Sequence, residues 1–309
     1  AGVCRRVLIL FCRLLIEVLT RMFNSIYFKL TYSIYTKRKH TVPVLTNLKE
    51  SKPLKILHIG DSGSGKTGAL ASLVKAGFKP VIMDFDNGMD ILATVCPADK
   101  LANVYYSTFT DEYKSIGGKV IPKGQAKAWA NALRFLESGK TPDGEQFLSV
   151  DKLTREHVLT LDSLTMAAQA AMLQVLQVNN RLLEAPFQSD WGEAQRIVEG
   201  LIQWLTSDQV KCHVIVNTHI SFIDLQSGVT KGYPSSIGKA LSTKIPRYFN
   251  TILLAQSKGS GKSSKRTITA LPQGVVETKA LIPADKLPES WPIETGLADF
   301  FKAAGYEKP

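Results

Sequence analysis

The chain contains 309 residues, of which 44% are hydrophobic and 21% are charged. This composition excludes a disordered or fibrous chain and is typical of a globular protein with one main domain. The net charge of +11 is unevenly distributed, because residues 1–55 carry +9 and residues 225–276 carry +8 without any acid, which leaves about −6 for the rest. We therefore expect residues 225–276 to face an anion.

Residues 1–50 differ in character from the rest of the chain. Their apolar run at 7–19 is interrupted by Arg13 and Glu17, so it is too short and too charged to span a bilayer, and it lacks the cleavage signal of a secretory peptide. We expect an N-terminal extension at 1–50 outside the core, a folded domain at 51–309 and no membrane partner. The four scattered cysteines lack zinc-finger and redox spacings, which indicates reduced thiols in the cytoplasm.

Strands alternate with helices from residue 55 onward, which predicts an α/β fold with a mostly parallel sheet flanked by helices on both faces. Strands are expected at 55–59, 80–85, 104–108, 157–161 and 212–218. Helices are expected at 66–76, at 125–138, after Asp162 toward 183, and in a segment that ends near 206 and begins with a capping box of Asp190 and Glu193. Residues 109–124 are expected to form a loop.

Beyond residue 218 the pattern changes to β-hairpins, which we expect as additions to the parallel sheet. Strands at 221–225 and 229–233 flank a short turn that contains Gly228. Strands at 251–256 and 267–271 flank a loop rich in Lys, Gly and Ser, and a C-terminal helix is expected at 297–304.

The segment GDSGSGKT at 60–67 matches the pattern G-x-x-x-x-G-K-[ST] in full, between a predicted strand and a predicted helix. Its glycines allow backbone N–H groups to surround phosphate oxygens, and the helix directs its positive end at the same place. Lys66 is expected to bind the β- and γ-phosphates, and the Thr67 hydroxyl is expected to bind Mg²⁺. We predict ATP, or a close relative, and Mg²⁺ as ligands, held by Gly60, Asp61, Ser62, Gly63, Ser64, Gly65, Lys66, Thr67 and Gly68. The partial match at 259–263 joins two strands, so we expect it to be a flexible hairpin loop.

Polar side chains follow three of the predicted strands. Asp162 ends one of them and is the candidate carboxylate for Mg²⁺, although an Asp at this place is also typical of a helix cap. Asp84 and Asp86 end another strand, and alternation would put both carboxylates on one side. We expect Asp86 to orient the attacking water, the alternative being a solvated turn. His219 is a candidate contact to the γ-phosphate, or a hydrogen-bonded structural residue.

Five segments in this order, GDSGSGKT, VIMDFDNGMD, VLTLDS, VIVNTH and GKALSTKIPRYFN, resemble the RecA-like P-loop ATPases over residues 55–282. The chain is most similar to the phage-encoded AAA-type nucleotide-binding proteins associated with single-strand annealing and recombination. The resemblance implies a homo-oligomeric ATPase that acts on single-stranded DNA, with a single-strand DNA-binding protein as a further partner, in the cytoplasm of a bacterial host. The carboxylate that activates water in this family is usually Glu. The matching residue here is Asp86, whose side chain is one methylene shorter.

The acid-free stretch is the candidate DNA contact, through Lys258, Lys262, Lys265 and Arg266, with Tyr233, Tyr248 and Phe249 as stacking partners for bases. The alternative is a solvated basic face with aromatic residues in the core. A GTPase would carry an N-K-x-D signature and a small-molecule kinase an Arg-rich lid, and we find neither. A nucleotide-dependent switch in an assembly or packaging complex, without DNA binding, remains an alternative function.

Overall fold

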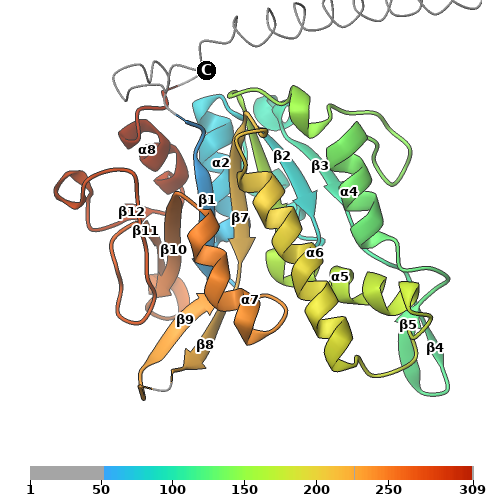
Figure 1. Ribbon diagram of the computed structural model, residues 1–309. Coiled ribbons are helices and arrows are strands. Elements are labelled where there is room, and N and C mark those ends of the chain that lie inside the picture. The colour runs from blue at the N-terminus through green and yellow to red at the C-terminus, as the bar shows by residue number, and fades with distance from the viewer. Residues whose placement is uncertain (1–51, 226, 308–309) are drawn as a thin grey trace, which may run out of the picture. The chain divides into compact units, whose positions relative to one another are not determined.

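The computed structural model describes residues 52–225 and 227–307, which include one compact unit that starts at Pro53 (Figure 1). The prediction of a separate extension at 1–50 lies outside the described residues. Within the described ranges, no helix combines the length and the apolar character that crossing a membrane requires.

An eight-stranded sheet forms the centre of the fold, with the strand order β12-β11-β10-β1-β7-β6-β2-β3. The six strands from β10 to β3 are parallel to one another, whereas β11 and β12 extend one edge in antiparallel pairing. The strand bounds are β1 (Lys55–Gly60), β2 (Lys79–Asp84), β3 (Tyr105–Thr108), β6 (His157–Asp162), β7 (His213–Thr218), β10 (Thr251–Lys258), β11 (Lys265–Thr269) and β12 (Trp291–Pro292). The prediction of a mostly parallel sheet is confirmed.

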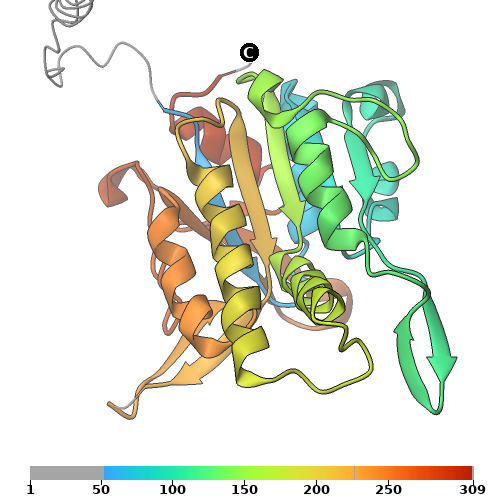
Figure 2. The same ribbon diagram turned by 45° about the vertical axis from the view of Figure 1, so that its right-hand side comes forward.

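Helices cover both faces of this sheet. They are α2 (Lys66–Ala76), α3 (Asp90–Val95), α4 (Ala128–Ser138), α5 (Leu164–Val178), α6 (Gln188–Thr206), α7 (Lys239–Lys244) and α8 (Gly296–Ala303). Figure 2 shows α4 and α6 in front of the sheet and α2 behind it. Alternation along β1 sends Leu57 and Ile59 into the core under α4, α5 and α6, and sends Ile56 into the second core with α2 and α8. Because the central strands β1, β2, β6 and β7 are covered on both sides, nearly all of their residues are buried.

The predicted loop at 109–124 contains a two-stranded hairpin, β4 (Tyr113–Ile116) with β5 (Lys119–Pro122). Its turn is Gly117-Gly118, and both glycines have positive φ values, of 56° and 76°. A two-residue turn of this kind suits the twist of antiparallel strands, and Gly-Gly is one of its sequence signals. The loop prediction was wrong because the strands are short and mostly exposed, so they lack an apolar alternation.

The start of α6 also differs from the prediction. Asp190 is the third residue of the helix, and its carboxylate accepts the backbone N–H of Phe187 at 2.7 Å, whereas Glu193 takes no part in this cap. The buried Asp190 carboxylate also accepts hydrogen bonds from Asn179 and Arg181, in the connection after α5. One carboxylate therefore joins the end of α5 to the start of α6. The second hairpin, β8 (Ile220–Asp224) with β9 (Thr230–Pro234), lies where it was predicted.

His213, at the start of β7, is a buried neutral group that makes stability depend on pH. Its Nδ1 accepts the backbone N–H of Leu54 at 3.1 Å, and its ring packs against Phe78, Phe301 and Tyr306. Burial lowers the pKa of His213 from 6.5 to about 3. The stability that this adds is fully present above pH 6.5 and is lost as the pH falls toward 3, because only the unfolded chain then takes up the proton.

We expect acidification from pH 7 to pH 5 to lower the free energy of unfolding by about 2 kcal/mol through His213. A His213→Asn variant keeps an acceptor for Leu54 but cannot take up a proton, so its loss over this interval should be smaller by that amount. Urea denaturation at the two pH values measures the difference. Equal losses in the variant and the original protein would contradict the assignment.

Candidate nucleotide site

The phosphate loop connects β1 to α2 and forms a tight turn that is held by hydrogen bonds within the loop. Gly63 and Gly65 have φ values of 75° and 93°, which favour glycine, and Gly65 is the residue before the first turn of α2. A Cβ on Gly60 would lie 2.7 Å from the carbonyl oxygen of Ala255 in β10, so a side chain has no room there. The Ser64 hydroxyl donates to the carbonyl of Asp61 at 2.7 Å and fixes the turn.

Lys66 is buried and lies within the loop. Its Nζ donates to the carbonyl oxygens of Gly60 at 2.7 Å and Asp61 at 2.9 Å. Burial lowers the pKa of Lys66, and the carboxylates of Asp162, Asp86 and Asp61 oppose this effect. A cation held by neutral carbonyls in a buried place is well suited to receive the negative oxygens of a phosphate chain.

Thr67 and Asp162 meet at the mouth of the loop, where the Thr67 Oγ1 donates to Asp162 Oδ2 at 2.6 Å. The strand that carries Asp162, β6, is separated from β1 by β7, and parallel pairing brings the carboxyl ends of all three to one edge of the sheet. Burial raises the pKa of Asp162 and nearby Asp86 adds to it, whereas Thr67 and Asn217 lower it. The Asp162 carboxylate therefore faces the loop and is not a cap of α5. A hydroxyl and a carboxylate are oxygen ligands that fit Mg²⁺.

Asp86 reaches the same place through Ser163. Its Oδ1 accepts hydrogen bonds from the backbone N–H of Ser163 at 3.2 Å and from the Ser163 hydroxyl at 2.8 Å. The peptide bond between Asp162 and Ser163 is cis. Ser163 thus fixes the Asp86 carboxylate beside Asp162. Ser163 was not among the predicted site residues, and its only signal in the sequence is its place directly after Asp162.

Asp84 has a different role from Asp86. β2 ends at Asp84, so the alternation that would place both carboxylates on one side does not extend to Asp86. The buried Asp84 Oδ1 accepts the backbone N–H groups of Asp86 at 3.1 Å and Gly88 at 3.3 Å, and burial raises the pKa of Asp84 to about 6. Asp84 therefore stabilises the turn after β2, and this turn carries the exposed side chain of Asp86.

His219, at the end of β7, is half-buried, and its Nδ1 lies 3.2 Å from the hydroxyl of Thr165 in α5. This contact fits the structural alternative, and a contact to the γ-phosphate remains a prediction. A second histidine, His58, lies in β1 two residues before the phosphate loop and was not predicted to be part of the site, because the sequence motif begins only at Gly60. It is fully buried, its Nδ1 is 3.0 Å from Asn217 Oδ1, and burial together with Lys66 lowers its pKa to about 3. A neutral His58 beneath the loop adds no charge that competes with Lys66.

The part of the chain that contains this site is also the part that is similar to a known protein family. A family model described as AAA domain matches residues 52–280. The chain belongs to this AAA-domain family. With the phosphate loop in place, this AAA domain is that of a P-loop ATPase.

Solved structures similar to this AAA domain include a KaiC-like protein from Pyrococcus horikoshii OT3, with 13% identity, a TM-score of 0.36, and coverage of 74% of this chain and 82% of the other. The RadB recombinase has 16% identity, a TM-score of 0.37, and coverage of 72% and 85%. The ATPase EscN of the enteropathogenic E. coli type III secretion system has 12% identity, a TM-score of 0.39, and coverage of 67% and 43%. Among curated proteins, no sequence matches significantly.

The basic stretch of the AAA domain does not form one unneutralised surface. Lys231 forms an ion pair with Glu277, and Lys244 lies 3.9 Å from Glu199, so acids from outside residues 225–276 neutralise part of it. Lys258 and Lys265 are exposed and occupy paired positions on β10 and β11. The side chain of Lys262 lies outside the described residues.

The aromatic residues predicted to stack with bases are differently placed. Phe249 is only 2% exposed and belongs to the core, so the prediction that it contacts DNA was wrong. The hydroxyl of Tyr248 donates to Glu199 Oε1 at 2.5 Å, which ties this ring to α6. An exposed aromatic residue close to the basic stretch is Phe222 in β8, at 59% exposure. Phe222 was not predicted to contact DNA, because it lies outside the basic stretch at 225–276.

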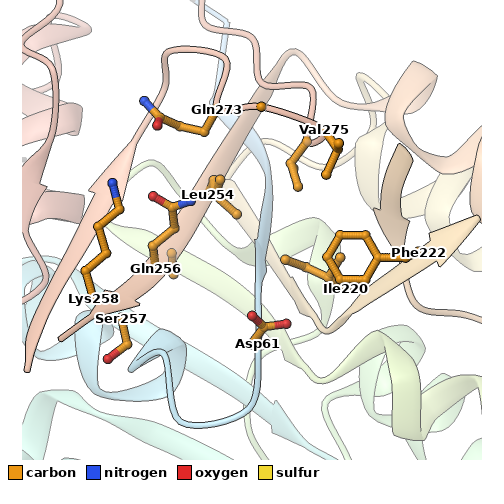
Figure 3. A pocket seen from close by; sticks show the side chains of 12 residues that line it. Asp61, Ile220, Phe222, Leu254, Gln256, Ser257, Lys258, Gln273 and Val275 are labelled. Carbon is orange, nitrogen blue, oxygen red and sulfur yellow. The ribbon is translucent and has the colours of Figure 1, made fainter. Parts of the chain in front are cut away.

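A cavity of about 500 Å³ lies beside the start of the phosphate loop (Figure 3). Asp61 and the end of β10, up to Lys258, form one side, and Ile220 and Phe222 of β8 form another. The turn at 273–276 completes the wall. The cavity therefore joins an exposed aromatic ring, a lysine and the nucleotide loop.

We expect Lys66→Ala to abolish ATP binding, with a loss of about 100-fold or more in affinity, because it removes the cation that the loop directs at the phosphates. Isothermal titration with ATP measures this loss, and the thermal unfolding midpoint confirms that the variant is folded. Lys75→Ala, at the exposed end of the same helix, is the matched control and should bind ATP normally. Retention of affinity in the folded Lys66→Ala variant would contradict the assigned site.

Proposed function

We propose that this chain is a Mg²⁺-dependent ATPase that acts on single-stranded DNA in phage-type recombination or replication. The observation that best supports ATPase activity is the hydrogen bond of 2.6 Å between the Thr67 hydroxyl and Asp162 at the mouth of the loop. Asp86 is fixed next to it by Ser163. A phosphate-binding loop, a metal-binding pair and a carboxylate for water are the parts that phosphoryl transfer to water requires.

Each side chain has a separate task in hydrolysis. Lys66 and the loop N–H groups bind the phosphates, and Thr67 with Asp162 would hold Mg²⁺. When bound, the ion neutralises charge that develops on the β- and γ-phosphates. The Asp86 Oδ1 is engaged with Ser163, which leaves Oδ2 to accept a hydrogen bond from the attacking water. The reach of Asp86 is shorter than that of Glu, and Ser163 compensates by holding the carboxylate in one orientation.

DNA binding is supported by the cavity beside the loop. Phe222 offers an exposed ring for a base, and Lys258 with its neighbour Lys265 offers charge for the backbone, which is how single strands are held without sequence readout. β10 lines this cavity at Ala255 and also abuts Gly60, so one strand touches both ligand sites. We further propose a homo-oligomer in the cytoplasm of a bacterial host, with a single-strand DNA-binding protein as partner.

We expect Asp86→Asn to leave ATP affinity nearly unchanged and to slow turnover by about 100-fold, since a general base contributes at least that factor. Steady-state phosphate release, with ATP binding measured in parallel, separates the two effects. Asp162→Asn should instead weaken the Mg²⁺-dependent part of ATP binding. Asp90→Asn, on the exposed start of α3, is the control and should match the original protein. Normal turnover in Asp86→Asn would place the base elsewhere.

We expect Phe222→Ala and the double variant Lys258→Ala with Lys265→Ala to weaken binding of a single-stranded oligonucleotide in different ways. The double variant should flatten the log-log salt dependence by about 1.4, because each phosphate neutralised contributes about 0.7 on single strands. Phe222→Ala should lower affinity without changing that slope. Fluorescence anisotropy over a series of salt concentrations measures both.

The control for this experiment changes Lys37, Arg38 and Lys39 to Ala, because those residues carry charge that attracts DNA without specificity. If that triple variant loses DNA binding while both cavity variants retain it, the DNA-directed function is overturned. A nucleotide-dependent switch in an assembly or packaging complex would then be the better account of the fold.

A further inference from the structure

Three side chains from separate parts of the chain approach the first turn of α2. A Cβ on Gly65 would lie 3.1 Å from Cγ1 of Ile293 and 3.3 Å from Cδ of Arg266 in β11. A Cβ on Gly68 would lie 3.7 Å from Cγ1 of Ile91 in α3. Ile91 is 42% exposed, so its side chain is accessible to a ligand beside the loop. The phosphate loop is therefore bordered by an arginine on one side and by an exposed isoleucine on the other.

Arg266 was predicted to contact DNA, but strand alternation turns it toward the nucleotide loop. Ile268, two residues further along β11, is fully buried in the core that contains α2 and α8, so Arg266 lies on the same face of the strand. The side chain is exposed, and among the described residues no carboxylate forms an ion pair with it. Its guanidinium charge is thus available to a ligand.

A second cavity, of about 490 Å³, opens beside Arg266. Its walls come from β11, from the loop before β11 and from the segment after β12, and they comprise Gly261, Ser264, Lys265, Arg266, Thr267, Pro292 and Glu294. Small-molecule sites have volumes of roughly 300–1,000 Å³. Two cations and one carboxylate line it, and the Arg266 stem connects it to Gly65. The space has the size for a nucleoside, which is the part of a nucleotide that extends beyond the phosphate loop.

The direction of the nucleotide follows from the reactive end of the site. Asp162 and Asp86 lie on the β6 side of the loop, where the terminal phosphate is attacked. The opposite end of the nucleotide must leave the loop past the first turn of α2. That turn is where Ile91 and Arg266 lie, so these side chains are the first groups that a nucleoside would meet.

We propose that Arg266 and Ile91 clamp the nucleoside of the bound nucleotide, with the guanidinium plane stacked on one face of the base and the isoleucine against the other. The proposal rests on the proposed function, in that the loop binds the triphosphate. A planar, delocalised cation stacks well on an aromatic ring, whereas an ammonium group does not replace it. Arg266 is accordingly a nucleotide-binding residue and not part of the DNA contact.

The test compares ATP with inorganic tripolyphosphate, which has the phosphates but no nucleoside. Isothermal titration of the full chain should show that Arg266→Ala weakens ATP binding by about tenfold and changes tripolyphosphate binding by less than about twofold. Arg266→Lys should remain weak for ATP, and Ile91→Ala should show the same selective loss as Arg266→Ala. Arg247→Ala, an exposed arginine in the same acid-free stretch, is the matched control and should bind both ligands normally.

Three results would overturn the clamp. Equal weakening of ATP and tripolyphosphate in Arg266→Ala would assign the guanidinium to the phosphates. Full ATP affinity in that variant would remove Arg266 from the site, and a loss of DNA binding with normal ATP binding would return it to the DNA contact. Failure of the original protein to bind either ligand would be a different result, because it would overturn the proposed function itself.

Discussion

The hydrogen bond between Thr67 and Asp162 is the interaction on which the arrangement of this protein depends. It joins the first turn of α2, which follows β1, to the end of β6. β1 and β6 do not pair with each other, so β7 must lie between them in the correct register. Ile59 pairs with Thr218 on one side of β7, and Leu161 pairs with Val216 on the other. A shift of β6 by one residue would turn Asp162 to the opposite face of the sheet. The apolar residues on both faces of these strands make such a shift costly, so the core fixes the position of the carboxylate.

The same contact concentrates charge in a place where water is scarce. Burial lowers the pKa of Lys66 and raises the pKa values of Asp84 and Asp162, because removal from water disfavours the charged form of each group. The neutral His58 below the loop keeps a further cation out of this cluster. A phosphate chain with its counter-ion would supply opposite charges to both kinds of group. The site is therefore organised for a ligand that carries charge of both signs.

Sequence alone predicted the parts of the site that depend on local chemistry. Glycines at fixed spacing between a strand and a helix identify the loop from Gly60 to Thr67, because few other functions need that backbone. Asp162 followed from its place at the end of an apolar strand, since parallel strands end at one edge of the sheet. The hairpin at 113–122 was missed because exposed strands carry no apolar alternation to distinguish them from a loop.

The features that sequence did not predict depend on residues distant along the chain. Lys231 is neutralised by Glu277, and Lys244 lies near Glu199, so an acid-free stretch of sequence is not an acid-free surface. Phe249 and Arg266 belong to the same stretch, yet one is in the core and the other borders the loop. Phe249 follows a short 3-10 helix before β10, whereas the position of Arg266 is set by the face of β11 that it occupies. The boundaries of a strand must be known to one residue before such a face can be assigned.

The helix α2 and the strand before it depend on elements that are synthesised after them, and one of these elements is α8. This helix packs on α2, and the backbone N–H of Ala298 donates to the Ser72 hydroxyl at 3.2 Å. β1 likewise pairs only with β7 and β10, which begin at His213 and Thr251. The ribosome makes the phosphate loop before β7 and β10, the two neighbours of β1, and before α8, which covers α2. A nascent chain would therefore carry the complete sequence of its nucleotide loop long before it had the neighbours that hold the loop in shape.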